Sequence, residues 1–402
     1  MPASGGKLRL PASPPWQCWA ALAFAAKLML AFSTIGTNDA TAYRAYAIAA
    51  WRHGGIWLFE NVRAYNHPPF MVHFLDAIAW AWARTGVPLE VWFRVLGSIA
   101  DVGSLFFVTR LTDAGRIRMT ITAIAPASIL VTGFHCNTDP IMIFVILASI
   151  YVLEKREDQD ASAMLLGVAS GIKLVPLFLL PAILSSLRHG RIRYLSVVAV
   201  TWSVLSMPYL VQIPIFVARN TFGWRSISGT WGFSLAGLLT DILTGSRLYP
   251  FSIRISSVAM LVALLALPFW FRRANVPLFD RCGITLLAFL FLAPGFGVQY
   301  LLWLVPFTAT VAIRMTLALH AACGLFLAGF YTYFCGGFPW YYADASRSIV
   351  YRRSPFSPMT GQGIVDLLSI LAWLTVGMVL AWRLREMSLP KEEAPAGTAA
   401  AL

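Results

Sequence analysis

Two charged residues stand at the edges of apolar segments, where a charge is costly. Asp39 is the first acid of the chain and directly follows an apolar stretch long enough to cross a bilayer. Its carboxylate could act as a general base towards a hydroxyl group. Lys173 lies in "LLGVASGIKLVPLFLLP", with no other charged residue between Asp160 and Arg188. Ionisable residues within apolar segments are rare and usually functional, and an ammonium there is suited to binding a phosphate.

Further donors and acceptors lie in short motifs near these two residues or beside later apolar segments. The motifs are "TND" (37–39), "YNHPPF" (65–70), "FHCNTDP" (134–140), "FGWRS" (222–226) and "PGFGVQY" (294–300). Four of their residues are expected to position a substrate: Asn38, Asn66, His135 and Asp139. The others are expected to bind the same anion as Lys173: His67, Arg225, Gln299 and Tyr300.

Most of these residues also have a structural interpretation. Asp39 could be a solvated loop residue, and a lone loop histidine often has no specific role. Asp139 precedes Pro140, and this pair is a strong helix-start signal, so we favour N-capping as its main role. Lys173 could extend its ammonium to the membrane surface. The polar motifs that accompany Asp39 favour a functional role for that residue.

The composition identifies a membrane protein. The 402 residues are 58% hydrophobic and 12% charged, with a mean hydropathy of +0.69, which excludes a soluble domain of this size. The formal charge of +13 comes from short Lys and Arg clusters between apolar runs, as in loops that face an anionic leaflet. We therefore expect membrane lipids as partners and no nucleic acid.

The cysteines and the first apolar stretch narrow the class of membrane protein further. Lys7 and Arg9 precede that stretch as in a signal peptide, but Lys27 inside it favours a retained first helix. No spacing of cysteines is typical of a zinc site or a disulfide framework, so we expect free thiols and assign no metal or cofactor. The cysteines are Cys18, Cys136, Cys282, Cys323 and Cys335.

Basic clusters alternate with apolar runs and predict the topology. If these clusters are cytoplasmic, the chain has about twelve transmembrane or partly spanning helices with both ends inside. We expect an all-α polytopic fold with one membrane domain over 1–389. A long first external loop over 35–90 should contain amphipathic helices and Asp39, and the tail over 390–402 should be disordered.

The candidate residues gather at turns expected on the external face. Besides the loop 35–90, these turns are 134–140, 170–176, 212–250, 294–300 and 336–356. Three arms have only about 12 to 17 residues per crossing, short of the roughly 20 that a span needs. Short helices are tolerated at membrane depth where they pack on protein or line a wet cavity, so we expect a cavity that opens outwards. The arms are 119–153, 161–187 and 282–313.

In their order, these motifs resemble the GT-C glycosyltransferases over roughly residues 16–315. The motifs are a first apolar helix ending in "ND", then "YNHPP", "NTDP", "GIKLVPLFLLP" and "VQYLLWLVPF". The likeness is greatest to the branch that includes polyprenyl-phosphate-dependent mannosyltransferases. The sequence departs from the family pattern in lacking a DxD pair around Asp39. It also has no large soluble domain after its last apolar segment, which argues against the oligosaccharyltransferase branch.

The resemblance implies an inverting enzyme that moves a hexose or pentose from a polyprenyl-phosphate donor to a glycan or lipid-linked acceptor. It implies that Asp39 is the catalytic base and that Lys173, Gln299 and Tyr300 border the donor phosphate. A secondary transporter or lipid flippase is the main alternative, and a non-catalytic membrane subunit is a third. The short loops and Ala-rich tail favour a bacterial plasma membrane over an endoplasmic reticulum, with the site on the extracytoplasmic face.

Overall fold

The computed structural model describes residues 15–223, 249–335 and 358–388. Within these ranges the chain forms sixteen α-helices, with short 3₁₀ and π-helical turns and no strand. Seven segments are long and apolar enough to cross a membrane, so the chain is a multi-pass integral membrane protein. They are α1 (Trp16–Ser33), α5 (Leu89–Leu111), the run Arg116–His135, α11 (Arg191–Gln212), α14 (Tyr249–Arg273), α16 (Ile313–Phe334) and α17 (Pro358–Ser388).

The long helices expose large apolar side chains, as helices in lipid do. Because lipid tails are as apolar as these side chains, such faces are stable in a bilayer and costly in water. Exposed apolar side chains on α11, α14 and α17 include Val204, Val211, Val258, Leu265, Phe269, Leu367 and Leu374.

Shorter helices lie between the long ones. They are α8 (Asp139–Lys155), α9 (Gln159–Ile172), α15 (Leu278–Leu292), the pair η2 (Val175–Leu179) and α10 (Leu180–Ser186), and the pair η6 (Val298–Leu304) and η7 (Pro306–Thr310). Prolines stand at the first or second position of α8, η2, α10 and η7, where a missing N–H removes no helical hydrogen bond. The prediction of short arms is confirmed for 161–187 and 282–313.

The same prediction is wrong for the first part of the arm 119–153. There α6 (Arg116–Ala123), α7 (Pro126–Leu130) and the π-helical turn η1 (Val131–His135) follow one another as a single 20-residue segment. Pro126 stands at the start of α7, so it begins a new helix without ending the crossing.

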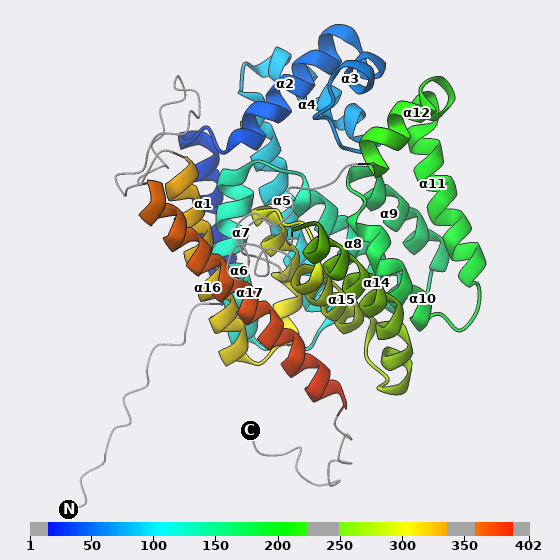
Figure 1. Cartoon of the computed structure of the whole chain (residues 1–402), viewed down its shortest axis with the longest axis vertical. Helices are drawn as coiled ribbons and strands as arrows, with labels where there is room; N and C mark the ends of the chain where they lie inside the picture. Colours follow the sequence, from blue (N-terminus) through cyan, green and yellow to red (C-terminus); the bar gives the residue numbers. More distant parts are fainter. Residues whose placement is uncertain (1–14, 224–248, 336–357, 389–402) are drawn as a thin grey trace, which may run out of the picture.

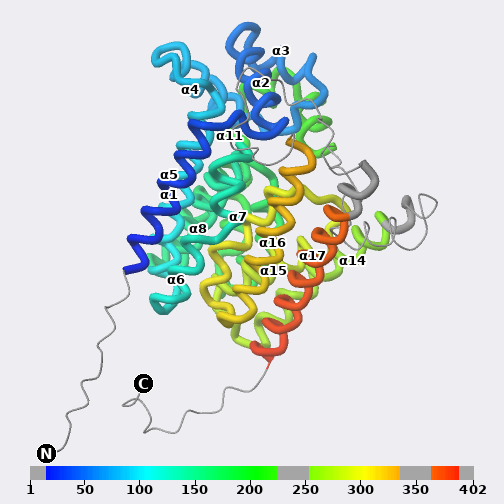
Figure 2. The backbone as a smooth tube through the Cα atoms, turned by 90° about the vertical axis from the view of Figure 1, so that its left-hand side faces the viewer, coloured from blue at the N-terminus to red at the C-terminus, as the bar shows by residue number. Residues whose placement is uncertain are grey.

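The segment 35–90 forms a helical cap at one end of the bundle, above α1 and α5 (Figures 1 and 2). The cap consists of α2 (Asn38–His53), α3 (Gly55–Asn61) and α4 (Phe70–Thr85). Helix α2 buries Ala40, Tyr43, Ala47 and Ala50, which are three or four residues apart and therefore share one face. The prediction of amphipathic helices in this segment is confirmed.

The first helix is tied into the bundle by a buried ion pair. Lys27 of α1 is 1% exposed and pairs with Asp101 of α5, which also accepts a 2.7 Å hydrogen bond from Ser128 of α7. A charge inside a membrane bundle is tolerated when it is paired in this way. Beside it, a Cβ at Gly133 would lie 2.9 Å from the Cα of Lys27, so the glycine lets η1 approach α1 closely.

Some predictions fall outside the described residues: Arg225, most of the turn 212–250, the turn 336–356 and the tail 390–402. All five cysteines are described, and each is a free thiol.

Candidate functional site

The start of α2 is docked on the end of η1, although about a hundred residues separate them. The Thr37 hydroxyl donates a 2.8 Å hydrogen bond to the carbonyl of His135 and accepts the N–H of Asp39 as the helix N-cap. Gly36 has a φ of +95°, and a Cβ there would lie 2.7 Å from the carbonyl oxygen of Phe134. Only glycine suits this position, because the dihedral and the close approach both exclude a side chain.

Docking places the Asp39 carboxylate against the His135 ring. Nε2 of His135 lies 3.0 Å from Oδ2 of Asp39, and Nδ1 lies 3.1 Å from the hydroxyl of Tyr331 on α16. His135 and Tyr331 are buried, whereas the Asp39 side chain is 34% exposed. Three segments distant in sequence thus form a chain of hydrogen bonds that ends at an accessible carboxylate.

The surroundings of Asp39 favour its ionised form. Partial burial raises the pKa of its carboxyl, but the hydrogen bond from His135 and the positive charge of Lys173 outweigh burial and hold the pKa below its ordinary value. At neutral pH the carboxylate is therefore unprotonated and able to accept a proton.

A second ion pair lies at the neighbouring turn. The ammonium of Lys173, which follows the last residue of α9, donates to both carboxylate oxygens of Asp139 at 2.8 and 3.1 Å. The indole N–H of Trp303 donates to Oδ1 of the same carboxylate at 2.9 Å. Asp139 is fully buried, so these donors replace the water that its charge would otherwise require.

Aromatic rings complete the surroundings of Lys173. Its ammonium lies 4.8 Å from the ring centre of Tyr300 and 5.5 Å from that of Trp303, and the two rings stack with their centres 4.1 Å apart. Both residues lie on η6, a 3₁₀ helix whose three-residue repeat brings positions i and i+3 to one side. The rings and the ammonium attract one another through cation–π interactions.

Two structural interpretations from the sequence are wrong. Asp139 is not the N-cap of α8, since Thr138 takes that position and the Asp139 carboxylate serves Lys173 and Trp303. The Asx-type contact at this helix start comes from Asn137, whose Oδ1 accepts the N–H of Asp139 at 2.9 Å. Lys173 does not extend to the membrane surface, because the buried acid holds its ammonium inside the protein.

His67 lies in the cap next to α2. Its Nε2 is 3.1 Å from the hydroxyl of Tyr43, and its carbonyl oxygen accepts from the hydroxyl of Thr221 at 3.4 Å. Burial lowers the pKa of His67 to about 3, and the positive charge of Lys173 acts in the same direction. His67 is therefore a neutral imidazole at pH 7 and can offer an N–H but no charge to an anion.

The other predicted residues do not join these contacts. Asn38 is exposed at the first turn of α2, and Asn66 is half-buried beside His67. Gln299 precedes Tyr300, but its amide lies over Gly297, where a Cβ would be 2.7 Å from Oε1. Within the described ranges, no group of three His, Cys, Asp or Glu side chains is arranged to hold a metal ion.

The sequence reasoning missed several residues of the site, above all Tyr331 and Trp303. Trp303 had a recognisable signal, because "QYLLW" spaces Tyr300 and Trp303 by three residues in a proline-bounded segment. Tyr331 had none, since it stands within an apolar helix 196 residues after His135.

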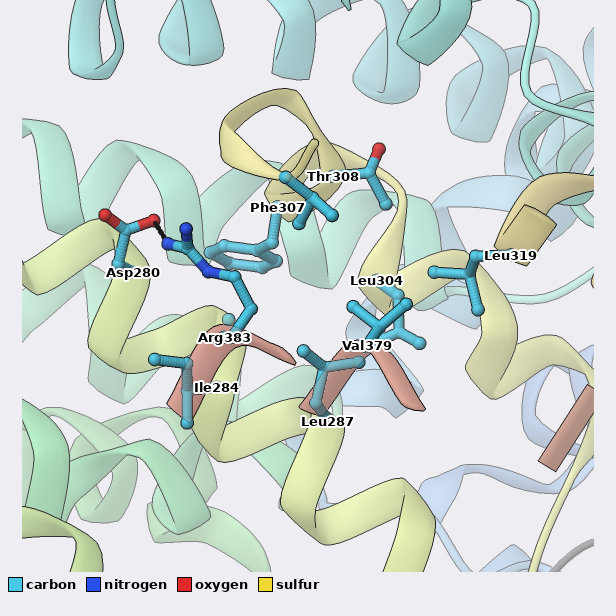
Figure 3. A pocket seen from close by; sticks show the side chains of 11 residues that line it. Asp280, Ile284, Leu287, Leu304, Phe307, Thr308, Leu319, Val379 and Arg383 are labelled. Carbon is cyan, nitrogen blue, oxygen red and sulfur yellow. Dashed lines mark ion pairs between the residues drawn. The ribbon is translucent and has the colours of Figure 1, made fainter. Parts of the chain in front are cut away.

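A small cavity lies apart from this site, between α15, η7, α16 and α17 (Figure 3). Its volume is about 10 Å³, which is room for about one water molecule and not for a substrate. The ion pair between Asp280 and Arg383 on its wall joins the start of α15 to the last turns of α17. We assign this ion pair a packing role.

No protein-family model matches this chain, and no curated protein matches it. The resemblance to GT-C glycosyltransferases therefore stays a prediction based on the motifs.

Proposed function

We propose that this protein is an inverting GT-C-type glycosyltransferase that moves a monosaccharide from a polyprenyl-phosphate donor to a glycan or lipid-linked acceptor. The observation that carries the proposal is the convergence of an accessible, ionised carboxylate and a partly buried ammonium on neighbouring turns. Asp39 and Lys173 interact electrostatically although they are 134 positions apart in sequence (173 − 39), and each is held by its own partner. An acceptor base beside a phosphate-binding cation is what this reaction requires.

The proposed step needs one proton transfer and one displacement. The acceptor hydroxyl oxygen forms a bond to the anomeric carbon while its proton passes to Asp39. The bond from that carbon to the phosphate oxygen breaks, and its electron pair stays on the departing polyprenyl phosphate. Attack from the side opposite the phosphate inverts the anomeric configuration. The phosphate leaves without protonation, so the mechanism needs no general acid.

Lys173 is suited to the phosphate side of this reaction. An ammonium has three N–H donors, and Asp139 accepts from it with two oxygens. The Lys173 side chain is 20% exposed, which leaves it accessible to an oxygen of the donor. The neutral N–H of His67 is a second donor for the same phosphate. Asp139 and Trp303 hold the ammonium in place before the donor arrives, and such preorganisation is a main source of catalysis.

The proposed topology has about twelve transmembrane or partly spanning crossings, with the cap on the extracytoplasmic face of a bacterial plasma membrane. Helix α5 begins beside the cap and carries Arg110 in its last turn. Its 23 residues extend about 35 Å, so Arg110 is a full membrane thickness away from the cap. The positive-inside rule favours a cytoplasmic Arg110 and hence an external Asp39.

The experiment uses the purified full chain in lipid nanodiscs, with a panel of labelled polyprenyl-phosphate hexoses and pentoses. A bacterial lipid extract supplies acceptors, and the readouts are released polyprenyl phosphate and the anomeric configuration of the product. Asp39→Asn should lower turnover by about 10² to 10⁴, the range for loss of a general base. Asp113→Asn changes an exposed acid in the loop after α5 and is the matched control.

The outcomes separate the proposal from its alternatives. Normal turnover in folded Asp39→Asn would remove that residue from the role of base. A secondary transporter or flippase would move the lipid across the membrane and leave the donor chemically unchanged. A transporter should also carry its key polar groups near the membrane midplane. Asp39 lies instead in the first turn of α2, and Lys173 directly follows the last residue of α9.

A further inference from the structure

His135 is the only residue of the described site whose two ring nitrogens each contact another functional side chain. Nε2 lies 3.0 Å from Oδ2 of Asp39, and Nδ1 lies 3.1 Å from the hydroxyl of Tyr331. The Tyr331 ring is fully buried against Phe134, with ring centres 4.9 Å apart. The hydroxyl therefore reaches His135 from inside the helix bundle, opposite the exposed carboxylate.

The chemistry of these groups gives the hydrogen bonds one direction. An ionised carboxylate only accepts, so Nε2 of His135 must carry the proton that faces Asp39. When the imidazole carries this one proton, its other nitrogen is an acceptor, and the hydroxyl of Tyr331 donates to it. The alternative tautomer would place a lone pair of Nε2 against the carboxylate and is disfavoured by repulsion.

The backbone of His135 is fixed by contacts of its own. Its carbonyl accepts the 2.8 Å hydrogen bond from Thr37, which caps the helix that carries Asp39. The next residue, Cys136, is buried and has a left-handed backbone with a φ of +66°. Such conformations cost energy in a non-glycine residue and persist where the surrounding structure imposes them, often at functional sites.

We propose that Tyr331 and His135 are positioning residues that hold one carboxylate oxygen of Asp39 and leave the other free for the acceptor hydroxyl. This inference rests on the proposed function. Oδ1 of Asp39 makes no hydrogen bond within the described residues, and the side chain is 34% exposed. The charged groups that face the carboxylate, or can become charged there, are His135 and Cys136 at the end of η1, Lys173 after α9, His67 of the cap, Tyr43 and Tyr46 of α2, Tyr300 of η6 and Tyr331 of α16.

A spectroscopic test addresses the arrangement without using catalysis. Nitrogen-15 NMR of histidine-labelled protein in nanodiscs distinguishes the two tautomers, and the signal of His135 is the one missing from His135→Gln. We expect Nε2 to carry a proton in the wild type, and a population of the tautomer without it in Tyr331→Phe. A wild-type ring protonated at Nδ1 alone would overturn the inference.

Kinetics then test the effect on Asp39. Tyr331→Phe should lower kcat about tenfold with little change in KM, as for loss of one hydrogen bond that matters in the transition state. The acid limb of the pH profile should move to higher pH, because weaker donation from His135 raises the pKa of Asp39. His135→Gln retains a side-chain N–H and should keep more activity than His135→Ala.

The control is Tyr194→Phe on α11, which removes another buried hydroxyl, one that bonds to Ser162 at 3.0 Å. It should match Tyr331→Phe in stability and leave kcat and the acid limb unchanged. If both variants behave alike in kinetics, Tyr331 is structural only and the inference is wrong. If the wild type transfers no sugar at all, the proposed function fails, while the NMR result still decides the arrangement.

Discussion

The ammonium of Lys173 lies 2.8 Å from the buried carboxylate of Asp139, 34 residues earlier in the chain. This pair joins the first residue of α8 to the residue after α9, and η6 contributes Trp303 to the same carboxylate. Because Asp139 is fully buried, the two charges depend on each other for stability. A substitution of Lys173 should therefore affect the stability of the fold as well as the binding of the donor phosphate.

Lys173→Met should separate these two effects. It leaves a buried acid without its cation, and we expect a loss of about 3 to 5 kcal/mol in the free energy of unfolding. Adding Asp139→Asn removes the uncompensated charge and should restore much of the stability without restoring donor affinity. The measurements are SDS-induced unfolding and binding of a labelled polyprenyl-phosphate sugar. Lys155→Met, at the exposed end of α8, is the control. Full donor affinity in the stable double variant would contradict the phosphate assignment.

Trp303→Phe tests whether the indole N–H matters for more than packing. The variant retains a ring to stack on Tyr300 but loses a hydrogen bond to a charged acceptor, at a cost of about 1.5 to 3 kcal/mol. Donor affinity should fall several-fold, because Asp139 no longer holds Lys173 as firmly. Trp373→Phe removes a comparable 2.9 Å indole hydrogen bond, to the carbonyl of Phe291, and should weaken stability alone. Equal donor affinities in the two variants would show that Trp303 only packs.

His67 should make the stability of the protein depend on pH. Its pKa is about 3 in the folded protein and near 6.5 in the unfolded chain, so the unfolded state binds the proton more readily below pH 6.5. Stability should therefore fall as the pH decreases from 6.5 towards 3, by at most about 1.4 kcal/mol per pH unit from this residue.

His67→Gln should flatten that dependence, which thermal unfolding of the detergent-solubilised protein between pH 7 and 4 would reveal. His53→Gln alters an exposed histidine at the end of α2 and should leave the slope as in the wild type. Identical slopes for the wild type and His67→Gln would mean that His67 is protonated without penalty in the folded state.

Labelling of cysteines can test the orientation in the membrane. In a Cys18→Ser background, Asn38→Cys places a thiol on the exposed start of α2, and Asp113→Cys places one at the other end of α5. A membrane-impermeant maleimide added to intact cells should label the first and not the second. The reverse pattern would place Asp39 in the cytoplasm, where external acceptors are absent.

Composition and the spacing of charges were sufficient to predict an all-α membrane protein with short helices and an amphipathic first loop. These properties follow from local rules, since each apolar run must be long enough to cross lipid and each proline restricts the helix around it. The segment from Pro126 to His135 is the exception. Whether a proline ends a membrane crossing or begins the next helix depends on the elements packed against it, and here these elements are α1 and α16.

The motifs also identified Asp39, His135, Asp139 and Lys173 as residues that belong at one end of the bundle, because charges beside apolar runs are costly wherever they have no partner. The identity of each partner came from packing between segments far apart in the chain. Tyr331 looks in sequence like any residue of an apolar helix, and it becomes part of the site because α16 lies against η1. Packing also decides the role of Asp139, which is an ion-pair partner and not an N-cap. The turn after α9 brings Lys173 within hydrogen-bonding distance of it, and no pattern along the chain specifies that distance.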